Sequence, residues 1–330
     1  MSERTVDAFA ELAIVRRSGI VESRHFGSLL AFNPDGTVAI ELGSPDDEVL
    51  PRSTVKPLQA MACVIAGAEL FGPELAIASG SHTGEDAHVA VVNSILQRAG
   101  LDEHALDCPI DRPEDEVTFE RMIREGEGRN RLRMNCSGKH AAMILACSVN
   151  GWSTDDYLDA AHPLQQQVLE TMAEMTGVPV SHTAIDGCGA PLFGTSVRGV
   201  AASFRSLVLA EQDSVAGRVA AAMRENPFYV GGSRHANSEL MVRMPGALAK
   251  GGAEGVIGVA SSDGASVSMK IIDGSPRATT VIALAVLESL GYDTRAAAAF
   301  AKVPVFGGGQ SVGQIEVGAD LRHAMAIGRA

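Results

Sequence analysis

Ser53 and Lys56 combine a hydroxyl and an amine at a spacing that suits nucleophilic catalysis. Residues i and i+3 share one face of a helix, so the two side chains can meet there. A serine hydroxyl is a weak nucleophile until a base takes its proton, and a lysine can act as that base when burial or a second cation keeps it neutral. Because Ser-x-x-Lys quartets also arise by chance, the alternative is a helix-capping serine beside a solvated lysine.

The element that carries this pair is predicted to be a helix. Proline is tolerated only in the first turn, so Pro57 indicates that the helix begins at about Ser53. The helix is expected to run to Leu70, before Gly72-Pro73 ends it. Ser53 would then lie at the positive end of the helix dipole, where an oxyanion is favoured, and it is the first candidate for the nucleophile. Ser81, described next, stays open as a second candidate.

Two further motifs lie where predicted elements end. Ser81 and His82 follow an apolar run and precede a predicted helix from Glu85 to Ala99. Lys250 follows a predicted strand and precedes Gly251-Gly252, so its amine is expected beside a backbone edge. An ordinary exposed strand lysine is the alternative for Lys250.

Two cysteines stand in clusters of reactive side chains. Cys136 and Lys139 lie just before a predicted apolar helix, 141–149, and Asp186 and Cys188 lie in a second cluster that is rich in glycine. Two thiolates with one or two nitrogen donors suit zinc. The two cysteines lack the Cys-x-x-Cys spacing of a structural zinc site, so a capped helix start and buried free thiols stay open as alternatives.

The pattern of elements predicts an α+β fold. Segments 14–43 and 246–273 are β-like and are expected to form one antiparallel sheet from both chain ends. The region between them, about 53–245, is mainly helical, apart from a charged, irregular surface excursion at 102–133. The remaining helices are expected at 162–175, 197–209, 214–224, 236–243 and 277–290. We therefore predict an α/β/α sandwich with a helical region beside the sheet, in one catalytic domain spanning 1–330.

Composition narrows the class of protein. The 330-residue chain has a formal net charge of −13 and a sequence pI near 5.1, which argues against a nucleic-acid or anionic-membrane partner. Its five cysteines are an odd number, which disfavours a disulfide scaffold. Without a long apolar run or a signal-like N-terminus, a cytoplasmic location is expected. No glycine-rich nucleotide-binding motif follows a predicted strand.

Together these motifs resemble the ordered signature of the asparaginase II family, the Rhizobium etli-type L-asparaginases. The resemblance extends from residue 52 to residue 274. It rests on Arg52-Ser53-Thr54-Val55-Lys56-Pro57, Gly80-Ser81-His82-Thr83-Gly84-Glu85 with His88, Asn135-Cys136-Ser137-Gly138-Lys139-His140, Asp186-Gly187-Cys188 with Pro191, Lys250-Gly251-Gly252-Ala253-Glu254-Gly255 and Lys270-Ile271-Ile272-Asp273-Gly274.

The resemblance implies a fold like that of penicillin-binding proteins and serine β-lactamases, usually as a homodimer. It also implies hydrolysis of L-asparagine to L-aspartate and ammonia. The catalytic groups that it implies are two serine-lysine pairs, Ser53 with Lys56 and Ser81 with Lys250. The zinc site that it implies next to these serines consists of Cys136, Lys139 and Cys188.

Recognition of an amino acid needs a cation for its carboxylate and an acid for its ammonium group. The predicted substrate-binding residues are Arg52, His82, Asp186 and Glu254. Lys139 and Arg234 are further candidates for the cation. The residues do not decide between asparagine and glutamine, because one methylene changes discrimination by only about 1 to 3 kcal/mol.

Other functions stay open at this point. A glutaminase, or another amidohydrolase such as a peptidase acting on cell-wall fragments, would use the same scaffold. A non-catalytic protein that binds a metal or an amino acid would keep the fold without the chemistry. A redox-sensitive protein would use Cys136 and Cys188 as its reactive thiols.

Overall fold

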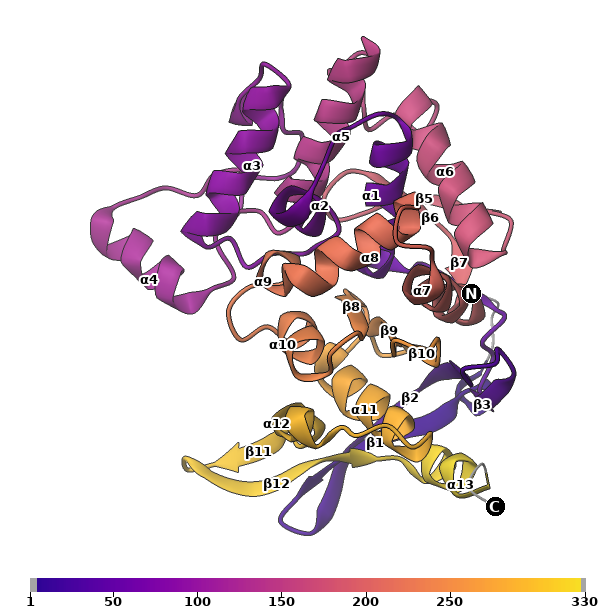
Figure 1. Cartoon of the computed structure of the whole chain (residues 1–330). Helices are drawn as coiled ribbons and strands as arrows, with labels where there is room; N and C mark the ends of the chain where they lie inside the picture. Colours follow the sequence, from indigo (N-terminus) through magenta and orange to yellow (C-terminus); the bar gives the residue numbers. More distant parts are fainter. Residues whose placement is uncertain (1–4, 328–330) are drawn as a thin grey trace.

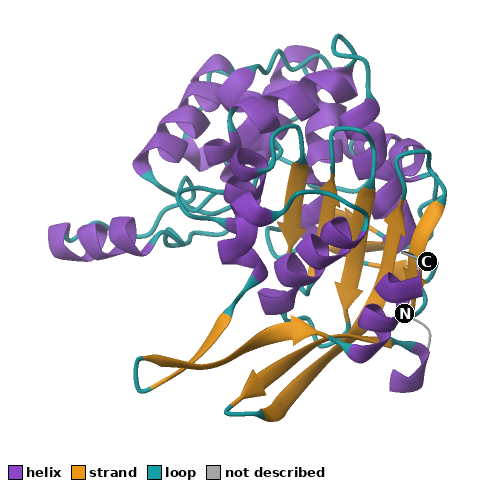
Figure 2. Ribbon diagram, turned by 60° about the horizontal axis from the view of Figure 1, so that its bottom comes forward, coloured by secondary structure: helices purple, strands orange, loops and turns teal. Residues whose placement is uncertain are grey.

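The structure is a computed structural model and describes residues 5–327 of the chain. One antiparallel sheet of eight strands contains segments from both ends of the sequence (Figures 1 and 2). The strand order is β11-β12-β1-β2-β10-β9-β8, and β3 pairs with β2 outside this path. The strands are β1 (Ala10–Arg17), β2 (Ile20–Phe32), β3 (Val38–Leu42), β8 (Leu248–Gly252), β9 (Val256–Ala260), β10 (Ser266–Ile271), β11 (Pro304–Gly307) and β12 (Gln310–Val317). The predicted α+β class and the predicted sheet from both chain ends are confirmed.

Helices cover both faces of this sheet (Figure 1). Helix α7 (Val197–Leu209) packs on β2, β9 and β10, where Ser266 Oγ donates a hydrogen bond to Ala201 O at 2.9 Å. Helices α11 (Thr279–Ser289) and α13 (Ala319–Ile327) pack on the other face. Side chains of β10 alternate between the two faces, and Val267 and Met269 belong to the large core.

A group of helices packs beside the sheet and carries much of the large core. These helices are α1 (Lys56–Ile65), α2 (Gly72–Ala78), α3 (Asp86–Arg98), α5 (Ser137–Asn150), α6 (Pro163–Thr176) and α8 (Val215–Glu225). The remaining helices are α4 (Glu116–Glu125), α9 (Pro227–Val230), α10 (Ala236–Arg243) and α12 (Ala298–Ala301). Two small sheets have two strands each. β4 (Glu48–Val49) pairs with β7 (Thr195–Ser196), and β5 (Thr183–Ile185) pairs with β6 (Pro191–Phe193).

Several predicted boundaries differ from the structure. The predicted helix at 53–70 is a 3-10 turn, Arg52–Val55, followed by α1, which ends at Ile65. The Gly72-Pro73 dipeptide begins α2 instead of only ending a helix, because proline is favoured in a first helical turn. Helix α5 begins at Ser137, ahead of the predicted start, and its first turn therefore contains Lys139.

The segment 102–133 and the C-terminal part contain structure that the sequence patterns did not predict. Helix α4 lies within the supposed irregular excursion, and the Asp115 side chain caps it by accepting Thr118 N at 2.8 Å. Strands β11 and β12 and helix α13 follow the last predicted helix. β12 pairs with β1, so the C-terminal part extends the sheet beyond the N-terminal strand.

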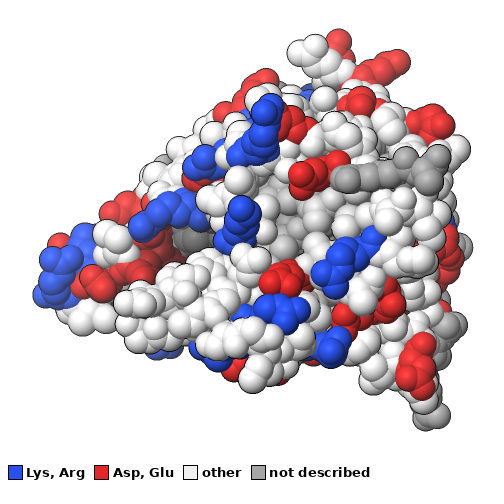
Figure 3. All heavy atoms as spheres, turned by 90° about the horizontal axis from the view of Figure 1, so that it is seen from below, with Lys and Arg blue, Asp and Glu red and all other residues white. Residues whose placement is uncertain are grey.

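The outer surface carries charges of both signs. On the face seen in Figure 3, acidic and basic side chains are interspersed. Among residues 5–327, no helix combines the length and the apolar character that crossing a membrane requires.

Candidate active site

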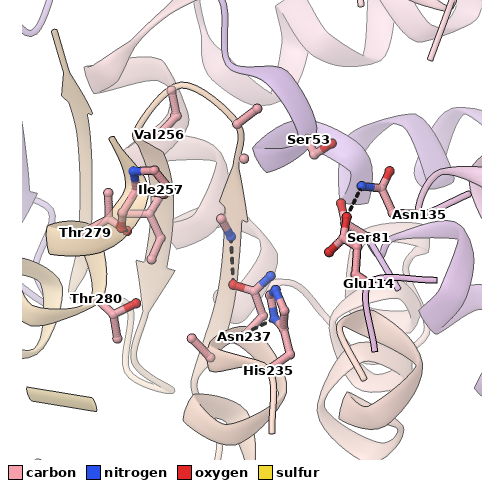
Figure 4. Close-up of a pocket in the computed structure, with 15 residues that line it drawn as sticks. Ser53, Ser81, Glu114, Asn135, His235, Asn237, Val256, Ile257, Thr279 and Thr280 are labelled. Carbon is pink, nitrogen blue, oxygen red and sulfur yellow. Dashed lines mark hydrogen bonds between the residues drawn. The ribbon is translucent and has the colours of Figure 1, made fainter. Parts of the chain in front are cut away.

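Two serines from different elements line one cavity of about 400 Å³ (Figure 4). Ser53 lies in the 3-10 turn that precedes α1, and Ser81 lies in the loop between α2 and α3. This loop is pressed against the end of α9, where Ser81 N donates to Val230 O at 2.8 Å. A Cβ atom on Gly80 would lie 2.7 Å from the same oxygen, so only glycine allows this approach.

Both predicted lysines converge on Ser81. Lys56 Nζ lies 2.9 Å from Ser81 Oγ, and Lys250 Nζ lies 3.0 Å from the same oxygen. Both lysines are fully buried. Lys56 comes from the first residue of α1 and Lys250 from the middle of the edge strand β8. The predicted contact between Ser81 and Lys250 is present, whereas Lys56 contacts Ser81 instead of the predicted Ser53.

The protonation state of Lys250 follows from its surroundings. Burial lowers the pKa of Lys250 well below 10.5, and the neighbouring Lys56 cation lowers it further. The acids Glu114 and Asp186 and the thiol of Cys136 act in the opposite direction, but more weakly. A neutral Lys250 amine has a lone pair that can accept the Ser81 proton. Ser81 is therefore positioned against a competent base.

The turn that carries Ser53 begins with a strained residue. Arg52 has φ +53°, which is the left-handed region that side chains other than glycine rarely adopt. An ion pair of 2.7 Å between Arg52 Nε and Asp186 Oδ1 holds it there. On the opposite side, a Cβ on Gly252 would lie 2.7 Å from Thr54 Oγ1. Because Gly252 has no side chain, β8 packs directly against the turn that carries Ser53.

The predicted metal ligands also come together. Cys136 precedes α5, Lys139 lies in its first turn, and Cys188 lies in the loop between β5 and β6. Lys139 Nζ lies 3.1 Å from Cys188 Sγ, and Cys136 Sγ lies 3.1 Å from Asn135 Oδ1. Both thiols are buried. The fold has therefore brought two distant segments to one buried centre.

The charges in this thiol centre are coupled. A hydrogen bond from Cys136, together with the Lys139 cation, lowers the pKa of Cys188 to about 5, although burial acts against this. The same hydrogen bond and burial raise the pKa of Cys136 to about 12. Burial works to lower the pKa of Lys139, but the Cys188 thiolate, with a smaller contribution from Asp186, raises it overall. The centre thus holds one thiolate against one ammonium group.

This donor set fits a metal ion of zinc type in its composition. Two sulfur atoms and one nitrogen atom are suitable zinc ligands, provided that Lys139 gives up its proton. Within residues 5–327, no three His, Cys, Asp or Glu side chains are arranged to hold a metal ion. The set therefore depends on the amine of Lys139 as the third ligand.

Three of the four predicted substrate-binding residues form a charged network beside the cavity. Arg52 pairs with Asp186 and lies 4.0 Å from Glu254 Oε1. Burial opposes ionisation of Asp186, but the nearby Lys139 and Arg52 lower its pKa overall. Arg52 and Glu254 also line a neighbouring pocket of about 360 Å³. Arg234, the other candidate cation, is exposed and has a left-handed φ of +61°.

The fourth predicted substrate-binding residue, His82, lies behind the cavity. Its side chain is fully buried, Nε2 lies 2.9 Å from Ser137 Oγ, and Nδ1 accepts Gly84 N at 3.2 Å. Burial lowers the pKa of His82 well below 6.5, and the nearby His88 lowers it further. His82 therefore holds the Ser81 loop against α5 and has no ring nitrogen left for a substrate.

Six polar residues of the cavity wall were not predicted as site residues from the sequence: Glu114, Asn135, His235, Asn237, Thr279 and Thr280. Asn135 stands in the reactive run before α5, which is the one signal that could have drawn attention to it. His235 and Asn237 resemble an ordinary helix start, since His235 caps α10. Glu114 belongs to a charged segment that has no distinctive pattern.

Comparisons with known proteins place this site in context. The chain is similar to a β-lactamase from Mycobacterium bovis, with 15% identity and a TM-score of 0.43, over 81% of this chain and 95% of that one. It is also similar to a predicted β-lactamase from Bacteroides dorei, with 12% identity and a TM-score of 0.45, over 81% and 94% of the two chains. A third solved structure, simvastatin synthase from Aspergillus terreus, has 9% identity and a TM-score of 0.36, over 74% and 86%.

These structural similarities are low and carry no inference about the substrate. No curated protein matches the chain. A family model described as L-asparaginase II matches residues 13–317, a range that contains both serines, both lysines and the thiol centre. With the serine and thiol motifs in place within this match, the chain belongs to the L-asparaginase II family.

Proposed function

We propose that this protein hydrolyses L-asparagine to L-aspartate and ammonia through a covalent serine intermediate. Membership of the L-asparaginase II family supports an asparaginase-type amidohydrolase. The observation that carries the serine chemistry is the convergence of Lys56 and Lys250 on Ser81 Oγ, at 2.9 and 3.0 Å, beside a cavity that Ser53 also lines.

In this proposal Ser53 attacks the side-chain carboxamide carbon. The Ser53 proton passes to Ser81 as the Ser81 proton passes to neutral Lys250, which becomes an ammonium group. Ser81 is suited to this relay because two amines already hold its hydroxyl, whereas Ser53 is free to face the substrate. Lys56, on the other side of Ser81, stabilises negative charge on the relay oxygen.

Backbone amides are available for the oxyanion that forms on the attacked carbonyl. The first N–H groups of a helical turn have no partner within the turn, which leaves the amide of Ser53 free. β8 is an edge strand, and its Gly251 N–H points outward to Asn237 Oδ1 at 2.9 Å. Ala253 follows β8 in the turn to β9 and lines the cavity, so its N–H is the second donor in this proposal. These two amides would bind the oxyanion from two sides.

The second half of the reaction returns the protons. Protonated Lys250 gives its proton back through Ser81 to the leaving nitrogen, which departs as ammonia. Water then attacks the β-aspartyl ester of Ser53, again losing a proton through Ser81 to Lys250. When the ester bond breaks, the Ser53 oxygen takes that proton back from Lys250 through Ser81, which restores the hydroxyl and the neutral amine and releases L-aspartate.

The test is ammonia release from L-asparagine and L-glutamine by the wild type, Ser53→Ala and Ser81→Ala. Both variants should lose on the order of 10² to 10⁴ in kcat. Hydroxylamine should release the acyl group as L-aspartate β-hydroxamate, and mass spectrometry of acid-quenched wild type without hydroxylamine should place the acyl group on the peptide that contains Ser53. An acyl group on Ser81, or normal turnover by Ser53→Ala, would overturn the assignment of the nucleophile. Faster release from glutamine would make the protein a glutaminase.

We also propose that Cys136, Lys139 and Cys188 hold zinc. When bound, zinc supplies a Lewis acid beside the cavity, which can position or polarise a substrate oxygen. The chain's own contribution is to keep two thiols and one amine together in a buried place. Metal analysis of the purified protein, and activity before and after chelation, would show whether the ion is required or accessory.

The homodimer and the cytoplasmic location stay predictions. The homodimer rests on the resemblance to the family. Light scattering at several protein concentrations would test the dimer, and fractionation of the producing cells would test the location.

A further inference from the structure

Glu114 is an acid on the wall of the cavity that contains the two serines. Its Oε1 accepts a hydrogen bond from Asn135 Nδ2 at 2.6 Å (Figure 4). Asn135 is neutral, and among residues 5–327 the structure gives Glu114 no ion pair with a basic side chain. The carboxylate therefore faces the cavity without a direct ion-pair partner among the described residues, although it interacts at longer range with Lys250.

The position of Glu114 is held from both sides. Its neighbour Pro113 is buried and packs so closely on Gly84 that a Cβ there would lie 3.0 Å from Pro113 Cα. Its other neighbour, Asp115, donates its backbone N–H to Thr83 O at 3.0 Å. Both contacts go to the loop that carries Ser81, so the acid and the serine keep a constant separation. Such a preorganised charge costs little to use in binding.

The other acids near the cavity are already neutralised. Asp186 accepts a hydrogen bond from Arg52 at 2.7 Å and also interacts with the Lys139 cation. Glu254 lies 4.0 Å from the same guanidinium group. Glu114 is therefore the acid best suited to bind a cationic group that arrives with a substrate.

Asn237 offers a complementary group on another part of the wall. Its Oδ1 must face Gly251 because the N–H of Gly251 is a donor, 2.9 Å away. That leaves Nδ2 as a buried donor without a hydrogen-bond partner among the described residues. Leaving a buried donor unpaired is unfavourable, so a substrate oxygen at this place would be stabilised.

We propose that Glu114 binds the α-ammonium group of the substrate and that Asn237 Nδ2 binds its α-carboxylate. The cavity then selects a free α-amino acid that carries a side-chain amide, and it disfavours amides that lack either charged group. This inference rests on the proposed function, which supplies the amide at Ser53, and it adds the residues that recognise the other end of the substrate.

Three related amides separate the two contacts. L-Asparagine has both charged groups, succinamate lacks the ammonium group, and 3-aminopropanamide lacks the α-carboxylate. Two substitutions of equal shape remove one contact each. Glu114→Gln removes the negative charge, and Asn237→Asp replaces the free donor with an oxygen while it keeps an acceptor for Gly251 N.

Each variant is expected to lower kcat/KM for a different pair of the three amides. Glu114→Gln should lower kcat/KM for L-asparagine and 3-aminopropanamide by roughly 10- to 100-fold, mainly through KM, and should spare succinamate. Asn237→Asp should lower kcat/KM for L-asparagine and succinamate by a similar factor and should spare 3-aminopropanamide. Glu116→Gln, which removes an exposed acid two residues away and outside the cavity, is the matched control and should change none of them.

Equal losses on all three amides would overturn the proposal. Equal losses are expected if Glu114 acts only through the protonation of Lys250. In that case Glu114→Gln would also shift the acid limb of the pH profile. Unchanged kinetics in either variant would overturn the corresponding contact. Thermal unfolding of each variant must match that of the wild type, and Glu114→Asp, which keeps the charge, should recover part of the lost affinity.

A binding experiment keeps this inference separate from the proposed function. Calorimetry measures the affinity of the wild type and Glu114→Gln for L-aspartate and for succinate, which lacks the ammonium group, without any turnover. A wild-type preference for L-aspartate that Glu114→Gln abolishes supports the contact even if no amide is hydrolysed. Absence of such a preference in the wild type overturns the contact even if asparagine is hydrolysed.

Discussion

Two buried centres near the cavity each contain a lysine, and the two lysines behave in opposite ways. Lys250 and Lys139 are both almost fully buried, at 0% and 2% exposure. The pKa of Lys250 is lowered by burial and then by the Lys56 cation, whereas the effect of burial on the pKa of Lys139 is outweighed by the Cys188 thiolate. Burial alone therefore does not decide the charge of a lysine. The sign of its nearest neighbour decides whether it can serve as a base.

The Ser81 centre and the thiol centre therefore have different roles. The Ser81 centre brings a neutral amine to a hydroxyl, which is what proton transfer needs. The thiol centre binds an ammonium group to a thiolate, which stabilises both charges but leaves no free base. A metal ion at the thiol centre would take the place of the lysine proton, because the amine must lose that proton before it can coordinate.

The largest expected effect comes from removing the base of the Ser81 centre. Lys250→Met keeps the length of the side chain without its nitrogen and should lower kcat by about 10² to 10⁴. Steady-state ammonia release measures this loss. Lys302→Met, at a lysine outside both centres, is the control and should leave kcat unchanged. A Lys250→Met enzyme with more than a tenth of normal kcat would contradict the role of Lys250 as base.

Breaking the thiol centre should affect stability more than Lys250→Met does. Cys188→Ala leaves the buried Lys139 cation without its main counter-charge and should lower the free energy of unfolding by about 3 kcal/mol in metal-free protein. Chemical denaturation measures this change. The double variant Cys188→Ala with Lys139→Met should recover most of the loss, since no unpaired charge is then left. An additive, larger loss in the double variant would contradict the pairing.

The pH dependence of activity should report Lys250. Because its amine must be neutral to accept a proton, kcat/KM should rise with pH through the lowered pKa and then level off. The acid limb should therefore lie well below 10.5. A limb close to the ordinary value of lysine would show that Lys250 is not the base.

The same group gives a stability effect with a defined sign. Between the lowered pKa of Lys250 and its ordinary value near 10.5, the unfolded chain binds more protons than the folded one. Stability should therefore rise with pH across this window, and Lys250→Met should lack this contribution. Denaturant unfolding at several pH values compares the two proteins.

The smallest expected effect concerns the ion pair that lies beside both centres. Arg52→Gln removes the partly exposed contact with Asp186 and should lower the free energy of unfolding by about 1 kcal/mol or less, since solvent screens the pair. Glutamine keeps the left-handed strain of this position, so the variant isolates the charge. Chemical denaturation should give a larger loss for Asp186→Asn, which also removes the interaction with Lys139, and the double variant should lose no more than Asp186→Asn alone.

Local patterns predicted many of the elements well. Helices α7 and α10 have the predicted bounds, Val197–Leu209 and Ala236–Arg243, because their apolar spacing and start signals lie within the segment itself. The bounds of α1 were less accurate. Its predicted start was Ser53 instead of Lys56, because the 3-10 turn Arg52–Val55 leads directly into the helix. Strands β11 and β12 were missed because few of their side chains are buried, and the pairing of β12 depends on β1, which lies far away in the sequence.

By itself, the sequence determined the reactive residues, the presence of helices next to them and the family resemblance. These features are local, because caps, prolines, glycines and side-chain types act within a few residues. Only the tertiary structure decided that Lys56 contacts Ser81, that Glu114 borders the same cavity and that Lys250 and Lys139 differ in charge. Each of these depends on which distant side chains the packing brings within a few ångströms, where Coulomb and hydrogen-bond interactions act.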